Sequence, residues 1–294
     1  MNCDCQSEKQ VLISVVIPTF KRNEELIVCL QSLQHYFIDG NSVGLYSSVE
    51  VVVSDDAADK ELQAFIGVTY PWCRYTIGPG RGPSANRNHG AYVAKGEWIV
   101  FTDDDCLPQP GWLEAYASIG GKYEVMEGRT SAEGIRSRVD EECPTNETGG
   151  YLWSCNLAIK KDIFMRLGGF NEDFPAAAME DVDLRKRIEK EGIEWIFVQD
   201  AVVKHPWRQR KDVRFVKKKA QSVASFIMLH PEMAKQYTLR ALVYKLLVSL
   251  KSSLLYCLNQ NNIRGLARQT YLETYLAASI WKEVRGIRSS NSSR

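Results

Sequence analysis

The stretch GEWIVFTDDDC, residues 96–106, decides the fold that we expect for this chain. Residues 97–102 form a short apolar run, which is typical of a strand buried on both faces of a parallel sheet. Three aspartates, Asp103, Asp104 and Asp105, follow where this strand ends. Because ligands of parallel α/β sheets bind beyond the carboxyl ends of the strands, we expect an α/β domain with a functional site at this edge.

The segments on either side of this stretch support the same fold class. Before it, apolar patterns predict strands over 11–17, 50–53 and 73–77, and helices over 23–37, 60–66 and 84–95. After it, we expect a long mobile loop over 129–150, strands over 152–159 and 193–198, and helices over 161–167 and 179–191. The alternation predicts a mostly parallel central sheet flanked by helices, followed by a C-terminal helical appendage.

The charge of the chain is divided unevenly along its length. The net charge is +1, but residues 1–203 carry 19 basic and 32 acidic side chains, whereas residues 204–294 carry 18 basic and 4 acidic ones. With 45% hydrophobic and 25% charged residues, the composition excludes a disordered or fibrous chain. We therefore expect a flexible tail over 1–10, an α/β domain over 11–210, and a basic helical segment over 211–294.

Other global features limit the location and the partners. The eight cysteines include no CxxC pair, which predicts scattered reduced thiols, and the N-terminus lacks the basic and apolar regions of a signal peptide. The apolar stretch 241–258 is interrupted by Lys245 and Lys251, so we expect no transmembrane helix. Its leucines at helical spacing predict a packing surface or, alternatively, contact of residues 211–260 with an anionic membrane. No nucleic-acid fold signature is present, so we expect no nucleic-acid partner.

The three adjacent aspartates indicate a metal site. Neighbouring carboxylates repel one another unless a counter-charge lies nearby, and hard oxygen ligands favour Mg²⁺ or Mn²⁺. If the strand alternation continues, Asp103 and Asp105 point to one side and Asp104 to the other. The alternative is a solvated acidic turn.

Two further groups lie at predicted strand or helix ends near this edge. Asp55 and Asp56 end the second strand, where a carboxylate can accept a hydrogen bond from a uracil or guanine ring or from ribose hydroxyls; an Asx turn is the alternative. In RGPSANR, residues 81–87, glycine permits close backbone approach and the helix N-terminus favours an anion. Arg87 would then face a diphosphate, unless this is only a capped surface helix.

A third acidic pair opens the predicted helix over 179–191. Glu180 and Asp181 lie in its first turn, where the helix dipole stabilises a negative charge. Such a carboxylate tends to stay ionised, as a general base must. The alternative is an acidic N-cap region without catalytic function.

Taken together, these motifs resemble those of the family 2 inverting glycosyltransferases of the GT-A fold. The matching segments, in the order of the family, are VVIPTFKR (15–22), VVVSDDA (51–57), RGPSANRNHGAYVAKGEWIVFTDDDCLPQPGWLE (81–114), LAIKKDIFMRLGGFNEDF (157–174) and MEDVDLRKRIEKEG (179–192). The resemblance implies a metal-dependent transfer of sugar from a UDP-, GDP- or dTDP-sugar to a hydroxyl of a glycan or lipid-linked acceptor. The resemblance further implies that the enzyme takes part in the synthesis of a cell-surface polysaccharide or glycoconjugate.

The resemblance also implies roles for single residues. Asp181 would be the catalytic base, with Glu180 beside it, and Asp105 the most direct ligand of Mn²⁺ or Mg²⁺, with Asp103 and His205 near the ion. Trp153, with the loop 129–150, would lie on the acceptor side. The nucleotide-sugar site would comprise Pro18, Thr19, Lys21, Asp55, Asp56, Arg81, Arg87, Asp103 and Asp104.

Two other functions compete with this interpretation. A sugar-phosphate nucleotidyltransferase would need a glycine-rich basic loop after the first strand, where this chain has PTFKR at residues 18–22. A non-catalytic carbohydrate- or membrane-surface-binding protein would tolerate loss of the metal-binding acids, but all of them are present. We expect a cytoplasmic enzyme, associated with the inner face of the membrane if the basic segment binds lipid.

Overall fold

The computed structural model describes residues 13–38, 49–119, 121–210 and 212–292. The predicted tail over 1–10 and Lys211 lie outside the described residues. The chain divides into two compact units: the first comprises Met1–Ser131, Pro144–Glu172 and Leu184–His205, and the second Ala132–Cys143, Asp173–Asp183 and Pro206–Arg294. The domain boundaries expected from the sequence remain a prediction.

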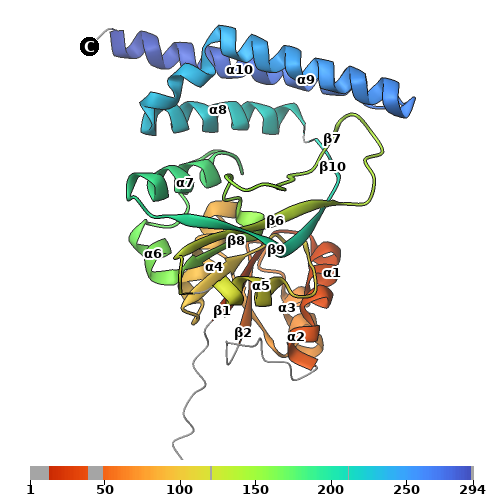
Figure 1. The fold of residues 1–294 in the computed structure, drawn as a ribbon, viewed down its shortest axis with the longest axis vertical. Coiled ribbons are helices and arrows are strands. Elements are labelled where there is room, and N and C mark those ends of the chain that lie inside the picture. The colour runs from red at the N-terminus through yellow and green to blue at the C-terminus, as the bar shows by residue number, and fades with distance from the viewer. Residues whose placement is uncertain (1–12, 39–48, 120, 211, 293–294) are drawn as a thin grey trace, which may run out of the picture. The chain divides into compact units, whose positions relative to one another are not determined.

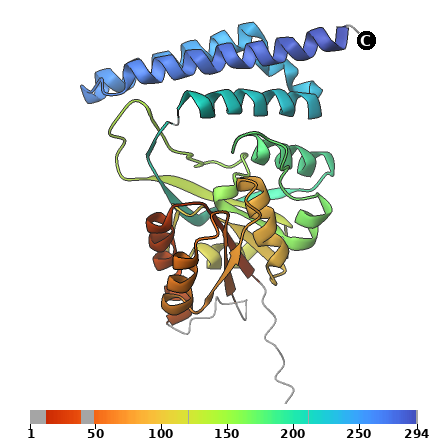
Figure 2. The same ribbon diagram turned by 180° about the vertical axis from the view of Figure 1, so that it is seen from behind.

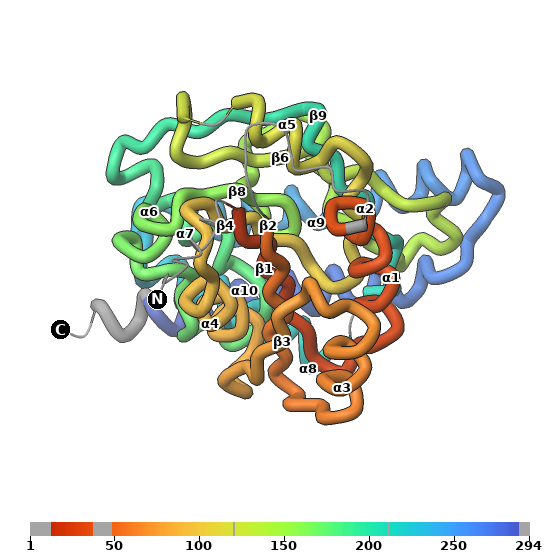
Figure 3. Tube along the Cα trace, turned by 90° about the horizontal axis from the view of Figure 1, so that it is seen from below, coloured from red at the N-terminus to blue at the C-terminus, as the bar shows by residue number. Residues whose placement is uncertain are grey.

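The first unit is built on an eight-stranded sheet with the order β3-β2-β1-β4-β8-β6-β9-β5 (Figures 1 and 3). The first four strands in this order run parallel, whereas β8 is antiparallel to β4 and β6, and β5 is antiparallel to β9. The strands are β1 (Ile13–Thr19), β2 (Val49–Asp55), β3 (Cys73–Ile77), β4 (Trp98–Phe101), β5 (Leu107–Pro108), β6 (Val125–Glu133), β8 (Leu157–Lys160) and β9 (Trp195–Pro206).

Helices cover both faces of this sheet because its central strands are apolar on both sides (Figures 1 and 2). In β1, Val15 and Ile17 pack into one core cluster and Val16 into the other. The first cluster receives residues of α1 (Asn23–Leu33), α3 (Lys60–Thr69) and α5 (Trp112–Ile119). The second receives residues of α4 (Pro83–Val93), α6 (Lys161–Arg166) and α7 (Glu180–Lys190).

The register of the parallel strands gathers their carboxyl ends at one edge. Thr19 of β1 is paired with Asp55 of β2, and Val16 of β1 is paired with Phe101 of β4. The aspartates after β4 therefore follow the sheet edge at which β1 and β2 end. This is the arrangement that the sequence predicted, and the predicted fold class is confirmed.

The segment over 129–150, expected to be a long loop, contains regular structure. β6 continues to Glu133, and residues Glu141–Glu142 form β7, which is antiparallel to β10 (Arg208–Gln209). The strand was not predicted because the sequence EGRTSAE, residues 127–133, is polar and its side chains show no apolar alternation. Glu127 is buried within it and accepts hydrogen bonds from the amides of Tyr151 and Leu152 at 3.0 and 2.9 Å.

The second unit is largely helical. It contains α8 (Val213–Leu229), the 3₁₀ turn η2 (Pro231–Tyr237), α9 (Leu239–Gln260) and α10 (Leu266–Ser292). Among the described residues, α9 is the one helix that is long and apolar enough to cross a membrane: it has 22 residues, and its most apolar window has a mean hydropathy of 1.5. Only 17% of its most apolar window is buried, and length and composition alone do not distinguish a spanning helix from a surface helix.

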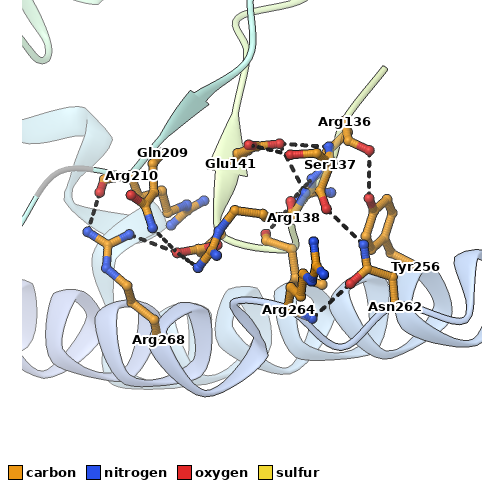
Figure 4. Close-up of polar contacts among 12 residues, drawn as sticks. Arg136, Ser137, Arg138, Glu141, Gln209, Arg210, Tyr256, Asn262, Arg264 and Arg268 are labelled. Carbon is orange, nitrogen blue, oxygen red and sulfur yellow. Dashed lines mark hydrogen bonds and ion pairs between the residues drawn. The ribbon is translucent and has the colours of Figure 1, made fainter.

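Within the second unit, a network around Asp140 joins the 132–143 segment to the helices (Figure 4). The buried Asp140 carboxylate accepts from Arg138 at 2.8 Å, from Gln209 at 2.9 Å and from Arg268 at 3.0 Å. Nearby, Tyr256 donates to the carbonyl of Arg136 at 2.9 Å. Burial by itself would raise the pKa of Asp140, but these hydrogen bonds outweigh it and hold that pKa at about 2.

Candidate functional site

Four side chains with metal-ligating atoms meet beyond β4. Asp103, Asp105, Cys106 and His205 place one ligand atom each within 4.8 Å of one another. His205, near the end of β9, has its Nε2 atom 3.7 Å from a carboxylate oxygen of Asp105. The turn that follows β4 gathers the first three, since the amide of Cys106 donates to the carbonyl of Asp103. The structure thus brings together the three ligands named from the sequence.

Cys106 was not singled out from the sequence as a candidate. Its side chain is completely buried, and burial raises the pKa of the thiol well above the ordinary value. A neutral thiol is a poor ligand for a hard cation. The ligand set that remains is two carboxylates and one imidazole, which fits Mn²⁺ or Mg²⁺ with further positions left for substrate oxygens.

The aspartates are surrounded by positively charged groups of the protein. Arg22, which follows β1, donates to Asp104 and to Asp105, at 2.6 Å in both cases. Arg87 of α4 donates to Asp103 at 2.6 Å, and Thr19 donates to Asp104 at 2.8 Å. Because Asp104 and Asp105 are almost completely buried, their negative charge requires such partners.

The expected alternation of the three aspartates does not describe their arrangement. β4 ends at Phe101, so the aspartates lie in a turn and no strand geometry fixes their directions. Asp103 and Asp105 do share the metal-binding group, but one guanidinium, that of Arg22, reaches both Asp104 and Asp105. The sequence missed Arg22 because its partners lie more than eighty positions away.

Asp55 and Asp56 have different surroundings. Asp55 is buried and accepts from the amides of Ala57 and Asp59 at 2.8 and 2.9 Å and from the hydroxyl of Tyr75 at 2.7 Å. These bonds are those of an Asx turn that closes β2. Asp56 is only half-buried and accepts from the amides of Gly80 and Gly82 at 3.0 and 2.8 Å. Asp56 is therefore better placed than Asp55 to meet a ligand.

The glycine-containing turn before α4 is shaped around Asp56. Gly82 has a φ of +97°, and Gly78 lies so close to Asp56 that an added Cβ atom would approach its carboxylate to 2.5 Å. Arg81 is exposed and forms an ion pair with Glu172 at 2.9 Å. Lys21, with a φ of +56°, is likewise exposed and lies next to the ring of Phe20. Arg81 and Lys21 are thus open to solvent, whereas Arg87 is bound to Asp103.

Glu180 and Asp181 occupy the first turn of α7, within the second unit. Glu180 is buried and Asp181 half-buried. The preceding residue, Met179, has a φ of +81°, a left-handed conformation that costs a non-glycine residue about 1–3 kcal/mol and that gathers at functional sites. In the same turn, a carboxylate oxygen of Asp183 lies 2.8 Å from the Nε2 atom of His230, which follows α8.

Trp153 lies in the first unit, where it is half-buried. Its ring packs against the first core cluster and against Tyr151, with ring centroids 4.5 Å apart. Tyr151 is exposed, so the pair presents an aromatic edge to solvent. Such an edge can stack on a sugar ring, although the contact with the core also accounts for the position of Trp153.

The chain is similar to known glycosyltransferases. The family model described as Glycosyl transferase family 2 matches residues 14–118. An uncharacterized glycosyltransferase of Haemophilus influenzae is 24% identical over 197 residues, which cover 61% of this chain and 63% of that protein. The GalNAc(5)-diNAcBac-PP-undecaprenol beta-1,3-glucosyltransferase of Campylobacter jejuni is 27% identical over 144 residues, 41% of each chain. The chain thus spans less than two thirds of the length of these relatives.

A solved structure supports the fold assignment. The mannosyltransferase PcManGT from Pyrobaculum calidifontis, in complex with GDP-Man and Mn²⁺, matches with a TM-score of 0.56 and 18% sequence identity. The match covers 92% of this chain and 86% of that one. At this identity the likeness establishes the GT-A fold and does not by itself assign a substrate.

Proposed function

The chain carries a glycosyl transferase family 2 domain on a GT-A fold, and from this premise we propose that it is a metal-dependent inverting glycosyltransferase. The observation that carries the proposal is the group of Asp103, Asp105 and His205 beyond β4, of which the two aspartates lie inside the residues that match the family. The donor is a nucleotide-diphosphate sugar, with UDP, GDP or dTDP as the nucleotide. The acceptor is a hydroxyl of a glycan or of a lipid-linked sugar.

The donor would lie along the edge where the parallel strands end. Asp56, held by the amides of Gly80 and Gly82, accepts from the nucleobase or the ribose. Thr19 borders the same edge, and its hydroxyl orients Asp104. Arg81 and Lys21, both exposed, supply positive charge for the diphosphate.

A divalent cation, Mn²⁺ or Mg²⁺, would be held by Asp105, Asp103 and His205. Its chemistry there is that of a Lewis acid, which offsets the charge that develops on the leaving diphosphate. The residues of the chain prepare this position: Arg22 fixes the Asp105 carboxylate, and Arg87 fixes that of Asp103. The carboxylates are thereby oriented before the substrate arrives, which lowers the cost of reorganisation.

Asp181 is proposed as the catalytic base. Its place in the first turn of α7 puts the carboxylate at the positive end of the helix dipole, and it would take the proton of the acceptor hydroxyl as that oxygen attacks the anomeric carbon. The glycosidic bond to the leaving diphosphate breaks in the same displacement, and the anomeric configuration inverts. Glu180 lies beside Asp181, and Trp153 with Tyr151 offers an aromatic edge for the acceptor sugar.

The acceptor and the cellular location belong to the same proposal. The Campylobacter relative acts, by its name, on an undecaprenol-linked saccharide, which supports a lipid-linked acceptor and a role in glycoconjugate or polysaccharide synthesis. An enzyme that uses such an acceptor together with a soluble nucleotide sugar would work in the cytoplasm, at the inner face of the membrane.

The two competing functions have weaker support. A nucleotidyltransferase would need backbone amides of a glycine-rich loop after β1, whereas this chain places the guanidinium of Arg22 on the acids there. A binding protein without catalysis would have no use for two carboxylates and an imidazole grouped within 4.8 Å, a set that fits a catalytic cation.

The proposal is tested by measuring nucleotide release from a panel of UDP-, GDP- and dTDP-sugars with Mn²⁺, with Mg²⁺ and with a chelator. We expect release from one donor class, dependent on the metal and increased by the correct acceptor. Asp105→Asn and Asp181→Asn should each lower transfer by at least about a hundredfold, since each removes a group that acts on the reacting atoms. The anomeric configuration of the product, read by NMR, tests inversion.

Asp200→Asn provides the matched control, because Asp200 is an exposed acid of β9 outside the site. This variant should transfer sugar at the parental rate. Full activity of Asp181→Asn would contradict the assignment of the base, and donor-independent nucleotide exchange would favour the nucleotidyltransferase.

A further inference from the structure

α9 has one face that packs within the second unit. Leu242, Ser253 and Cys257 are buried, and Leu242 belongs to a small core cluster with residues of α8 and α10. Figures 1 and 2 show α9 and α10 running side by side. The buried positions lie on one side of the helix, as the 3.6-residue period requires. α9 is thus anchored to its neighbours by one side only.

The opposite face of α9 is apolar and exposed. Seven large apolar side chains lie on it in two groups, one before and one after Lys251, with exposed fractions from 45 to 77%: Val243, Tyr244, Leu247, Val248, Leu254, Leu255 and Leu258. An exposed helix face normally carries charged or polar residues. Single exposed apolar side chains need no explanation, but a contiguous stripe of this kind marks an interaction surface. We call these seven residues the α9 stripe.

The charged side chains of α9 itself are all positive. Arg240 and Lys251 are exposed on the same side of the helix, and α9 contains no acidic residue. In α8, Arg214, Lys217 and Lys218 are also exposed. Residues 204–294 as a whole carry 18 basic and 4 acidic side chains. A second copy of this chain would bring like charges together, whereas an anionic bilayer presents the opposite charge.

The charges within α9 also favour a helix that lies on the membrane over one that crosses it. Lys251 lies in the middle of the stripe, where its apolar stem can lie along the bilayer while its ammonium reaches the headgroups. A spanning helix would hold both Lys245 and Lys251 in the hydrocarbon, and it would expose the buried face at Leu242, Ser253 and Cys257 to lipid.

We infer that α9 lies flat in the surface of an anionic membrane, with the α9 stripe in the boundary between headgroups and acyl chains and the basic residues on lipid phosphates. The partner of the basic segment would then be an anionic lipid surface. The inference rests on the proposed function at one point only: a lipid-linked acceptor would explain why the enzyme needs a membrane.

The test is flotation of the full-length protein with phosphatidylcholine vesicles that contain or lack phosphatidylglycerol. We expect the protein to float with the anionic vesicles, to float poorly with the neutral ones, and to be released in part by high salt. Leu247→Ser/Leu254→Ser should weaken partitioning on the order of a hundredfold, because two leucine side chains no longer enter the lipid. Arg240→Gln/Lys251→Gln should reduce the preference for anionic vesicles.

Val28→Ser/Val68→Ser is the matched control. These side chains of α1 and α3 are 48 and 84% exposed, so the same kind of change is made on apolar surface of the first unit, outside α9. The control variant should float like the parent, and circular dichroism should show all variants folded, since every substituted side chain is exposed.

Three results would overturn the inference. The first is unchanged flotation of the Leu247→Ser/Leu254→Ser variant. The second is a dimer in sedimentation velocity that this variant abolishes, which would assign the stripe to a second copy of the chain. The third is vesicle binding that resists both salt and carbonate extraction, which would indicate a spanning helix. Donor hydrolysis in solution is measured in parallel, so that loss of catalysis and loss of lipid binding are distinguished.

Discussion

At the scale of single residues, Arg22 has the most informative place in the site. Its guanidinium bonds to two nearly buried carboxylates, those of Asp104 and Asp105, while Arg87 serves Asp103. Three acids in a row would otherwise repel one another. These arginines therefore let the aspartates fold together without a cation, and the proposed cation would add to a site that the chain has already assembled.

Arg22→Gln is expected to lower the free energy of unfolding of the metal-free protein by about 1–3 kcal/mol, because two buried carboxylates lose a charged donor. With saturating Mn²⁺ the deficit should shrink, since the ion supplies positive charge to Asp105. Urea unfolding with chelator and with Mn²⁺ measures both values. Lys60→Gln, an exposed lysine of α3, is the control. An equal deficit in the two conditions would show that Arg22 and the cation do not share Asp105.

Much of the site could be predicted from the sequence at this scale. Asp103 and Asp105 are near neighbours in the chain at the end of an apolar strand, so local pattern was sufficient to group them. His205 was named through the family resemblance, and the structure places it 3.7 Å from Asp105. Arg22 could not be assigned, because no local pattern indicates which acid an arginine reaches across more than eighty residues.

At the scale of secondary structure elements, the parallel half of the sheet was predicted more completely than the antiparallel half, in which the expected strands over 152–159 and 193–198 correspond to β8 and β9. β3 spans Cys73–Ile77 as expected, because its ends are marked by turns and its residues suit a strand. β6 was not predicted, because a buried Glu127 does not fit the apolar pattern of a strand. Its carboxylate accepts hydrogen bonds from backbone amides of a segment far away in the sequence. β5 and β10 have two residues each, too few for any periodicity to appear.

The start of α10 depends on a glycine. Gly265 has a φ of +86°, and a Cβ atom added there would lie 1.9 Å from the Asp140 carboxylate. Gly265→Ala should therefore lower the free energy of unfolding by at least about 2 kcal/mol, through left-handed strain and displacement of Asp140. Gly286→Ala, inside α10 where an added Cβ meets nothing within 4 Å, should instead raise it by up to about 1 kcal/mol. Thermal unfolding of the pair measures the two opposite signs.

The anchoring of the 132–143 segment should depend on pH. The pKa of Asp140 is about 2 in the folded protein against an ordinary value of 3.8, so ionisation stabilises the fold by about 2 kcal/mol at neutral pH. Because the folded pKa is the lower one, this contribution is present above pH 4 and is lost as the pH falls toward 2.

Asp140→Asn should accordingly be destabilised at pH 7, and its deficit relative to the parent should narrow as the pH approaches 2. Urea unfolding at a series of pH values measures the difference, and Asp200→Asn, on an exposed acid, is the control. A deficit of constant size across this range would mean that the charge of Asp140 does not contribute and that only its shape matters.

At the scale of the whole molecule, the charge division found in the sequence runs alongside the division of tasks that we propose. The acids of the proposed metal site and the residues that match the family lie before residue 206, and the α9 stripe with the cations of α9 lies after it. A net charge of +1 therefore describes neither part. A charged resin or membrane interacts with the charges on the part of the protein surface that faces it, and not with the net charge of the whole molecule.

Ion-exchange chromatography at neutral pH should reveal this division. A protein with +1 charge spread evenly would bind weakly to either resin, whereas this chain should be retained at low salt by both a cation and an anion exchanger. Lys217→Gln/Lys218→Gln and Lys60→Gln/Lys95→Gln have the same net charge, and all four lysines are exposed. The first pair should elute from the cation exchanger at distinctly lower salt, while the second should elute there like the parent and bind the anion exchanger more tightly. Equal shifts of the two variants on both resins would show that the charges act as an average, and would contradict an electrostatic attraction of the basic segment to an anionic membrane.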